Sequence, residues 1–269
     1  MSECIPLKGE ILKQVQSVEL EILSVVTHFC DAHDIRYFLS SGTLLGAVRH
    51  NGFIPWDDDI DISMPRADFE RFMSLHALLP REYECVATRF CDQYPIGIVK
   101  VRKNGTIMRE PRMKNLNINH GIWIDIFPID RVKNIERVKR RAKLVHLITM
   151  AISYKLGLES NVKLHTQIIC RMLAYLEISR LDRIRTKIMT LEEKTDGEFF
   201  TNFVSNLGYK KLLFSESVLF PFSKVKFEND DYYAPAKPDQ WLIQAYGEYW
   251  EFPPISEQVN RHKIMEIKT

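Results

Sequence analysis

Residues 41–64 read SGTLLGAVRHNGFIPWDDDIDISM, and this stretch has the most informative pattern of the chain. Its last six residues alternate polar and apolar side chains, as a half-buried β-strand does. Asp59 and Asp61 then project from one face of that strand, while the isoleucines beside them point into the core. Neighbouring carboxylates repel each other, so the spacing favours a hard counterion such as Mg²⁺ or Mn²⁺.

Two other interpretations of the acidic run remain open. A solvated acidic loop accounts for Asp57 and Asp58, although not for the alternation that follows them. A calcium-binding loop needs Gly at its sixth position and Glu at its twelfth, where this chain has Ile62 and Asp68. The metal-binding strand agrees best with the pattern.

A second apolar strand is predicted at 121–127, and Asp125 is its one carboxylate among bulky residues. A carboxylate in such surroundings must be paired or bound to metal if it is buried. An Asp-x-Asp pair on one strand and a single Asp on another suffice for metal-assisted phosphoryl or nucleotidyl transfer. Asp59, Asp61 and Asp125 are therefore the predicted metal ligands and catalytic residues.

Upstream, Gly42 and Thr43 lie between a short strand predicted at 36–40 and a short helix predicted at 44–50. Backbone N–H groups at such a helix start attract phosphate, and the threonine hydroxyl adds a further donor. We expect Gly42 and Thr43 to contact a substrate phosphate.

The remaining periodicities place strands and helices alternately along the first 130 residues, which predicts an α/β core with a mixed sheet. From 131 to about 195 the pattern is helical. We therefore expect a catalytic core at 1–130, a helical insertion at 131–200 and a C-terminal segment at 201–269 that packs on the core. The expected elements of the core, besides those above, are a helix at 7–33 with Ile11 on its buried face, a helix from Pro65 to Leu79, and strands at 83–88 and 96–102.

Composition excludes several classes of protein. Lys and Arg number 37 against 35 Asp and Glu, a balance that does not favour nucleic acid as a partner. Five cysteines without a CxxC pair indicate reduced thiols. The first ten residues lack the pattern of a signal peptide, and no run approaches the ~20 apolar residues of a membrane span. A cytoplasmic location is expected.

The run at 41–61 resembles the signature of the LicD family of phosphotransferases, which includes the fukutin-related proteins. The similarity continues through GIWIDIFPID at 121–130. It resumes at short motifs in the C-terminal part of the chain: Phe220-Pro221, Tyr246-Gly247, Pro253-Pro254 and Arg261-His262.

The resemblance implies a nucleotidyltransferase-like fold. It also implies transfer of a phospho-alcohol, with phosphocholine as the leading candidate, from a CDP-linked donor to a sugar hydroxyl. The acceptor it implies is a cell-surface glycan precursor, such as that of a teichoic acid or a lipopolysaccharide. Carried over to this sequence, the family pattern makes Asp59 and Asp61 the metal-binding pair, Asp125 the third acidic residue, and Gly42 and Thr43 the phosphate-contacting turn.

Further substrate-binding candidates are cationic or aromatic. Lys100 and Arg102 share one face of the strand at 96–102 and can neutralise a diphosphate, although a solvated strand face is an equal alternative. Arg49 lies within the run at 41–61, and His262 can contact phosphate or deprotonate an acceptor hydroxyl. Each has a purely structural alternative. The aromatic residues at 246–250 can stack on cytosine or enclose choline, with core packing as the alternative.

Residues 131–143 contain seven Lys or Arg and one Glu, and the apolar run 144–152 follows them. Such a segment suits a surface that rests on anionic lipid, at the inner face of a membrane where lipid-linked glycan precursors are found. A solvated helix that leads into a buried one fits the same pattern.

Two rival functions use the same residues. A nucleotidyltransferase attacks the α-phosphorus of an NTP and releases pyrophosphate. A catalytically silent protein of the same fold binds a glycan or nucleotide without turnover.

Overall fold

The computed structural model describes residues 4–158, 163–205 and 207–269. Residues 1–3 of the predicted N-terminus and 159–162 of the predicted helical insertion lie outside this part. A mixed sheet with strand order β1-β2-β6-β4-β3 forms the centre, and β7 and β8 extend it from β6. The predicted α/β class is confirmed. The strands of this sheet are β1 Phe38–Leu39, β2 Asp61–Pro65, β3 Tyr83–Val86, β4 Val99–Lys103, β6 Trp123–Val132, β7 Phe199–Thr201 and β8 Leu213–Ser215.

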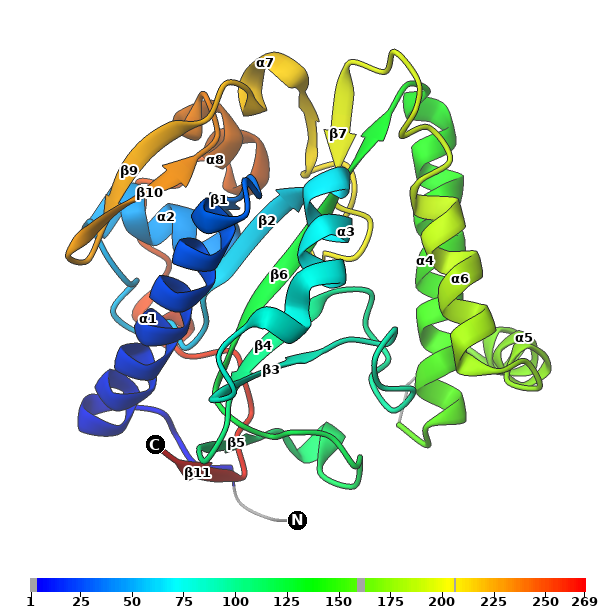
Figure 1. The fold of residues 1–269 in the computed structure, drawn as a ribbon, viewed down its shortest axis with the longest axis horizontal. Helices are drawn as coiled ribbons and strands as arrows, with labels where there is room; N and C mark the ends of the chain where they lie inside the picture. The colour runs from blue at the N-terminus through cyan, green and yellow to red at the C-terminus, as the bar shows by residue number, and fades with distance from the viewer. Residues whose placement is uncertain (1–3, 159–162, 206) are drawn as a thin grey trace.

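β2 and β6 run parallel, and every other neighbouring pair in the sheet is antiparallel. Helices α1 Gly9–Ala32 and α3 Arg66–Leu75 pack against one face of these strands (Figure 1). A buried ion pair joins α3 to β6, with Arg66 Nε 2.7 Å from Asp130 Oδ1. The two strands that carry the predicted acidic residues are therefore adjacent and anchored from one side.

Helix α1 agrees with the predicted helix at 7–33, and its buried face differs from the predicted one at Ile11. Ile11 is exposed, and Leu12 is buried instead. The buried stripe also contains Glu19, a charged residue on an otherwise apolar face. This face of the helix packs on the core and on residues 57–60, the acidic loop that precedes β2.

Two local boundaries differ from the prediction. Helix α2, Ser41–His50, begins at Ser41, so Gly42 and Thr43 lie in its first turn rather than in a loop before it. Pro65 ends β2 and precedes α3, because its extended backbone at φ −52° and ψ 145° continues the strand. Asn51 then ends α2 in the left-handed conformation that the Asn-Gly turn favours.

The helical layer consists of α4 Ile135–Lys155, α5 Leu164–Leu173 and α6 Ile178–Met189. In the run 144–152, Val145, Ile148 and Ile152 are buried, so much of it packs inward. Arg141 is also buried, in an ion pair with Glu192. None of the described helices is long and apolar enough to cross a bilayer. The division of the chain at 130 and 200 stays a prediction.

The C-terminal part returns to the core. A hairpin of β9 and β10 packs near β1 and α2, and β11 pairs with β5 (Figure 1). The segment before β11 thereby carries His262 back to the acidic loop. The remaining elements are β5 Ile107–Arg109, β9 Ser223–Phe227, β10 Asp230–Ala234, β11 Glu266–Lys268, α7 Glu216–Leu219, α8 Pro238–Tyr246, and the 3-10 turns η1 His76–Leu78, η2 Pro111–Met113 and η3 Ile255–Glu257.

Candidate active site

Three adjacent strands align two carboxylates and an ammonium group. Asp61 on β2 is the register partner of Asp125 on β6, which is in turn the register partner of Lys100 on β4. Register partners project from the same face of a sheet, so the three side chains form a row. Lys100 Nζ donates to both Asp125 oxygens, at 2.7 and 2.8 Å. The charge of Asp125 is thus already paired, whereas Asp61 has no cationic partner among the described residues.

The start of α2 holds Asp61 in place. The Asp61 backbone N–H donates to Thr43 Oγ1 at 2.8 Å, and its carbonyl accepts from the Ser40 N–H at 3.1 Å. Ser41 has φ of +50°, a strained backbone for a serine, and its hydroxyl bonds the Asp61 side chain. A Cβ at Gly42 would lie 2.7 Å from Asp57 Oδ2, so a larger residue there would require the Asp57 side chain to move. Thr43 is buried and its oxygen accepts from the acidic strand.

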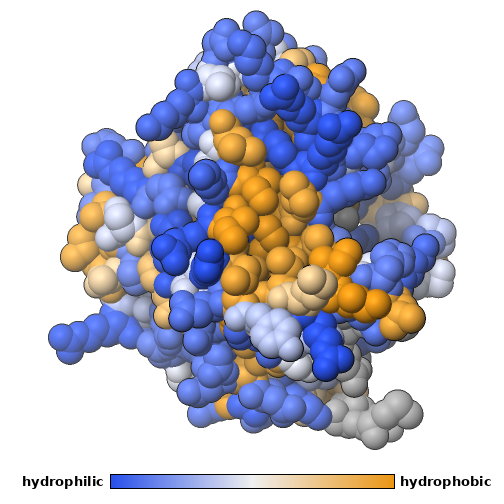
Figure 2. Space-filling view, turned by 90° about the vertical axis from the view of Figure 1, so that its right-hand side faces the viewer, coloured by the Kyte–Doolittle hydropathy of each residue, from blue (hydrophilic) through white to orange (hydrophobic). Residues whose placement is uncertain are grey.

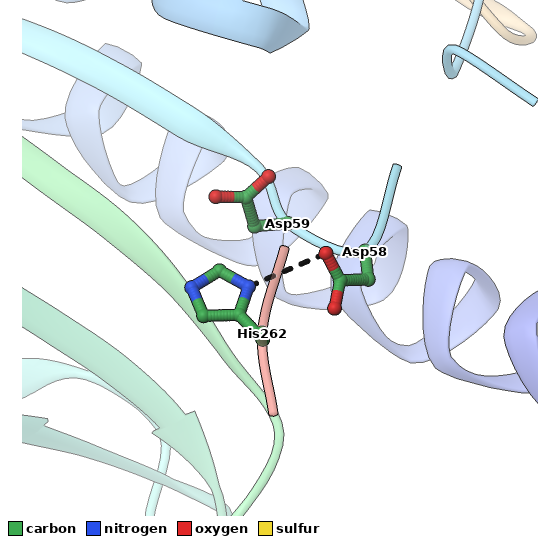
Figure 3. A group of neighbouring side chains, drawn as sticks. All are labelled: Asp58, Asp59 and His262. Carbon is green, nitrogen blue, oxygen red and sulfur yellow. Dashed lines mark hydrogen bonds and ion pairs between the residues drawn. The ribbon is translucent and has the colours of Figure 1, made fainter. Parts of the chain in front are cut away.

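Asp58, Asp59 and His262 form a second grouping at the same end of β2. Each offers one ligand atom, and these atoms all lie within 4.8 Å of one another; within the described ranges this is the one such group of three or more His, Cys, Asp or Glu. Figure 3 shows the contact from His262 Nδ1 to Asp58 Oδ1, at 3.3 Å. The predicted set of Asp59, Asp61 and Asp125 is not such a group. Asp125 accepts from Lys100 instead.

Glu19 adds a further carboxyl group that the sequence interpretation missed. Its side chain is fully buried, and neither oxygen has a hydrogen-bond partner within the described chain. The charges of Asp59 and Asp58 act on it most strongly. One turn earlier on α1, Gln16 Nε2 donates to the Asp57 carbonyl at 2.9 Å. The sequence contains a signal for this role of Glu19, because an acidic residue interrupts the apolar stripe of the helix.

Burial and mutual repulsion shift the pKa values of this cluster. Burial is the first cause for Glu19, Asp57, Asp59 and Asp61, and neighbouring carboxylates add to it; each pKa is raised. For His262, burial alone would lower the pKa, but the bond to Asp58 and the charge of Asp59 raise it to about 9. The folded chain therefore holds carboxyl groups that are protonated or in need of a cation.

The side chains fit a divalent cation. Asp58 Oδ2 and both Glu19 oxygens are buried without a partner, which is costly unless a cation or water is bound there. The donor set of carboxylate oxygens suits Mg²⁺ or Mn²⁺. Asp59 belongs both to the predicted set and to the group with His262.

The other predicted cations have structural partners. Lys100 and Arg102 are buried against Trp123, with Lys100 Nζ 4.1 Å and Arg102 Cζ 4.6 Å from the ring centroid. Arg102 also donates to the Gly121 carbonyl at 2.7 Å. The alternative of a solvated strand face is wrong, because both side chains are buried. Contact of Lys100 and Arg102 with a diphosphate stays a prediction.

Arg49 lies at the edge of the site and holds the C-terminal loop. Its Nη1 donates to the Tyr249 carbonyl at 2.7 Å, and its guanidinium stacks on Phe252 at 4.6 Å. Arg49 therefore contributes by positioning, and direct contact with phosphate would require these bonds to break.

The aromatic residues of the segment 246–250 have different surroundings: some pack in the core and others lie near the site. Tyr249 is buried, whereas Trp250 is exposed. Burial and the charges of Asp61, Asp57 and Asp59 raise the pKa of Tyr246, which places that phenol beside the acidic cluster. Phe252 is also exposed and lies 6.3 Å from the Trp56 ring. These rings border the acidic loop.

The metal-free protein should lose stability as pH rises from 6.5 to about 9. His262 contributes stability that is present below its unfolded pKa of 6.5 and is lost through its folded value of about 9. The raised carboxyl pKa values act in the same direction, because these groups keep protons that the unfolded chain has released. We expect Tm to fall across this interval in chelator, and to fall less with Mg²⁺ or Mn²⁺ present. A Tm that rises with pH in chelator would contradict the assignment.

Comparisons with known proteins agree with this geometry. Residues 34–143 match the family described as LicD/FKTN/FKRP, nucleotidyltransferase domain. The chain is 25% identical over 266 residues to the lipopolysaccharide cholinephosphotransferase LicD of Haemophilus influenzae, which covers 95% of this chain and 97% of that protein. A 44-residue segment, 16% of this chain and 9% of the other, is 43% identical to the human ribitol 5-phosphate transferase FKRP. A further 70 residues are 40% identical to an uncharacterized protein of Rickettsia typhi, covering 24% and 23% of the two chains.

Proposed function

We propose a specific reaction, on the premise that residues 34–143 match the family described as LicD/FKTN/FKRP, nucleotidyltransferase domain. The protein moves a phospho-alcohol, phosphocholine in the first instance, from a CDP-linked donor to a sugar hydroxyl of a cell-surface glycan precursor. The names of the relatives, a cholinephosphotransferase and a ribitol 5-phosphate transferase, support the predicted enzyme class of phosphotransferase.

One observation carries the proposal: Asp59, Asp61 and their neighbours form a half-buried carboxylate cluster whose pKa values are raised and whose oxygens are in part unpartnered. Asp58, Asp59 and Asp61 would hold Mg²⁺ or Mn²⁺, which supplies positive charge to the diphosphate when it is bound. Glu19 adds a further carboxyl group on the buried side of the cluster, and its negative charge would also favour the bound cation.

The proposed reaction is an in-line displacement at the β-phosphorus of the donor. The acceptor oxygen forms the new bond to phosphorus, and the bond from phosphorus to the oxygen of CMP breaks. Asp61 takes the acceptor proton, because its carboxylate lies in the cluster and has no cationic partner among the described residues. Asp125 is less suited to this role, since both of its oxygens accept from Lys100.

Cations of the chain must offset the remaining negative charge. His262, with its pKa raised to about 9, is protonated at neutral pH and offsets Asp58 and Asp59. Arg261 is exposed, has no ion-pair partner among the described residues, and its charge acts on Tyr246. We assign the diphosphate contact to Arg261 rather than to Lys100 or Arg102. The exposed rings of Trp250 and Phe252 provide faces for cytosine or for a quaternary ammonium group.

Donor binding should depend on the divalent cation, because a carboxylate cluster repels a diphosphate. We expect CDP-choline with Mg²⁺ or Mn²⁺ to raise Tm, by an amount equivalent to about 2.7 kcal/mol at 100 times Kd. Chelator should remove the shift. With a glycan acceptor, CMP should appear in proportion to the modified sugar.

The same assay separates the rival functions. Release of pyrophosphate from an NTP, with no response to any CDP-alcohol, would replace the proposal by a nucleotidyltransferase. Binding of donor without turnover at every cation concentration would indicate a catalytically silent binding protein.

A further inference from the structure

Helix α5 presents an apolar face to solvent. Leu164, Ile168, Met172 and the following Tyr175 recur at spacings of four, four and three, which places them on one side of the helix. Their exposed fractions are 73%, 54%, 68% and 85%. Cys170 on the opposite side is buried toward α4. The helix therefore uses its narrower face for packing and leaves its wider apolar face uncovered.

The apolar area continues onto the neighbouring helices. Figure 2 shows a broad orange region on the side of the molecule formed by α4, α5 and α6, bordered by hydrophilic side chains. Leu144 and Tyr154 on α4 and Ile184 on α6 are also exposed. A continuous exposed apolar region of this kind is typical of an interaction surface.

The charge of this layer differs from that of the rest of the chain. Residues 135–190 hold twelve Lys and Arg against four Asp and Glu, whereas the whole chain holds 37 against 35. The remainder of the chain is therefore acidic on balance. Ten of these cations are exposed and have no ion-pair partner within the described ranges: Arg137, Lys139, Arg140, Lys143 and Lys155 on α4, Lys163 and Arg171 before and on α5, and Arg180, Arg183 and Lys187 on α6.

The other cations of the layer are structural. Arg141 pairs with Glu192 and donates to the carbonyls of Ile188 and Met189. Arg185 is fully buried and pairs with Asp182. The buried cations thus hold the helices together, and the exposed cations lie on the surface of the same helical layer as the apolar face of α5.

We propose that this face docks on an anionic lipid bilayer, with α5 lying in the interface and its apolar side chains among the acyl chains. An apolar helix face with a cationic border matches a surface that is apolar within and negative at its headgroups. A second copy of the chain is disfavoured, because it would bring an equally positive face. The purpose of the docking, which is to bring the site to a lipid-linked acceptor, rests on the proposed function. The site and the helical layer are directly connected, because β6, which carries Asp125, leads into α4.

The test is co-sedimentation of the full chain with vesicles of phosphatidylcholine, with and without phosphatidylglycerol. Wild type should sediment with the anionic vesicles, and added salt should weaken this binding. Arg140→Gln, Lys143→Gln and Arg183→Gln together should lower the partition coefficient roughly 100-fold, at about one charge contact each. Ile168→Ser with Met172→Ser should lower it at least about tenfold.

Matched controls alter exposed residues elsewhere. Ile243→Ser with Ile255→Ser removes apolar side chains outside the helical layer, and Lys8→Gln, Lys210→Gln and Lys211→Gln removes three charges. Both control proteins should bind like wild type. Equal sedimentation of wild type with neutral and anionic vesicles, or equal losses in test and control variants, would overturn the proposal.

Turnover on a soluble acceptor distinguishes this proposal from the proposed function. Every surface variant should keep wild-type turnover there, because the altered residues lie outside the carboxylate cluster. A chain that binds anionic vesicles but accepts no CDP-alcohol would contradict the reaction and leave the docking surface standing. A chain that is active but ignores vesicles would do the reverse.

Discussion

Asp61→Asn is expected to lower turnover by roughly 10³-fold or more, which corresponds to about 4 kcal/mol of transition-state stabilisation. Asparagine keeps the shape of the side chain but removes a charged cation ligand and the proposed proton acceptor. The fold should survive, because Thr43 and Ser40 bind the backbone of residue 61 and not its carboxylate. Asp59→Asn should act in the same direction.

Two measurements separate lost chemistry from lost structure. In chelator, Asp61→Asn should have an equal or higher Tm than wild type, since one repulsive carboxylate is gone. Asp231→Asn, an exposed position on β10, should retain wild-type turnover as the matched control. Turnover close to wild type in Asp61→Asn would remove the carboxylate cluster from the mechanism.

Lys100→Met is expected to lower the free energy of unfolding by about 3–5 kcal/mol. Both Lys100 and Asp125 are buried, and removing the ammonium group leaves the Asp125 charge without its partner. Lys103→Met, on the same strand, is the matched control. Lys103 pairs with Glu21 at 2.6 Å, but that pair is solvent-exposed and should contribute about 0–1 kcal/mol. Urea unfolding measures both.

The pair can also be tested by rescue. Lys100→Met combined with Asp125→Asn should recover much of the lost stability, because no unpaired charge remains, while turnover stays low. If Lys100→Met were as mild as Lys103→Met, Asp125 would not depend on Lys100. Asp125 would then be open to a cation, as the sequence alone had suggested.

Local pattern was enough to predict the central elements. The spacing of apolar residues predicted α1, and the alternation after Asp59 predicted β2, because both periodicities depend only on residues that are close in sequence. The same pattern predicted β6 with Asp125, and the run at 41–61 predicted the family. The roles of Asp59, Asp61 and Asp125 stay predictions.

The short strands β7 to β11 were not predicted. They have at most five residues each, too few for a periodicity to emerge, and they form because distant segments pair with them. On α1 the prediction was wrong at Ile11, since Ile11 and Leu12 are both apolar and only tertiary packing selects between them.

The character of the site was decided by tertiary structure. Asp58 and His262 are 204 positions apart in the sequence but in contact in the structure, and no local sequence pattern predicts such a contact. Lys100 is a plausible phosphate ligand in sequence, but its alignment with Asp125 makes it a buried partner. Arg140 and Arg141 are neighbours in the chain, yet one faces solvent and the other is buried. Sequence determined which charges the chain carries and how they are spaced along each element. Only the packing of distant elements decided which charged groups are removed from water and which group lies opposite each of them. Desolvation and neighbouring charges are the two factors that set the energy of a charged group in a protein.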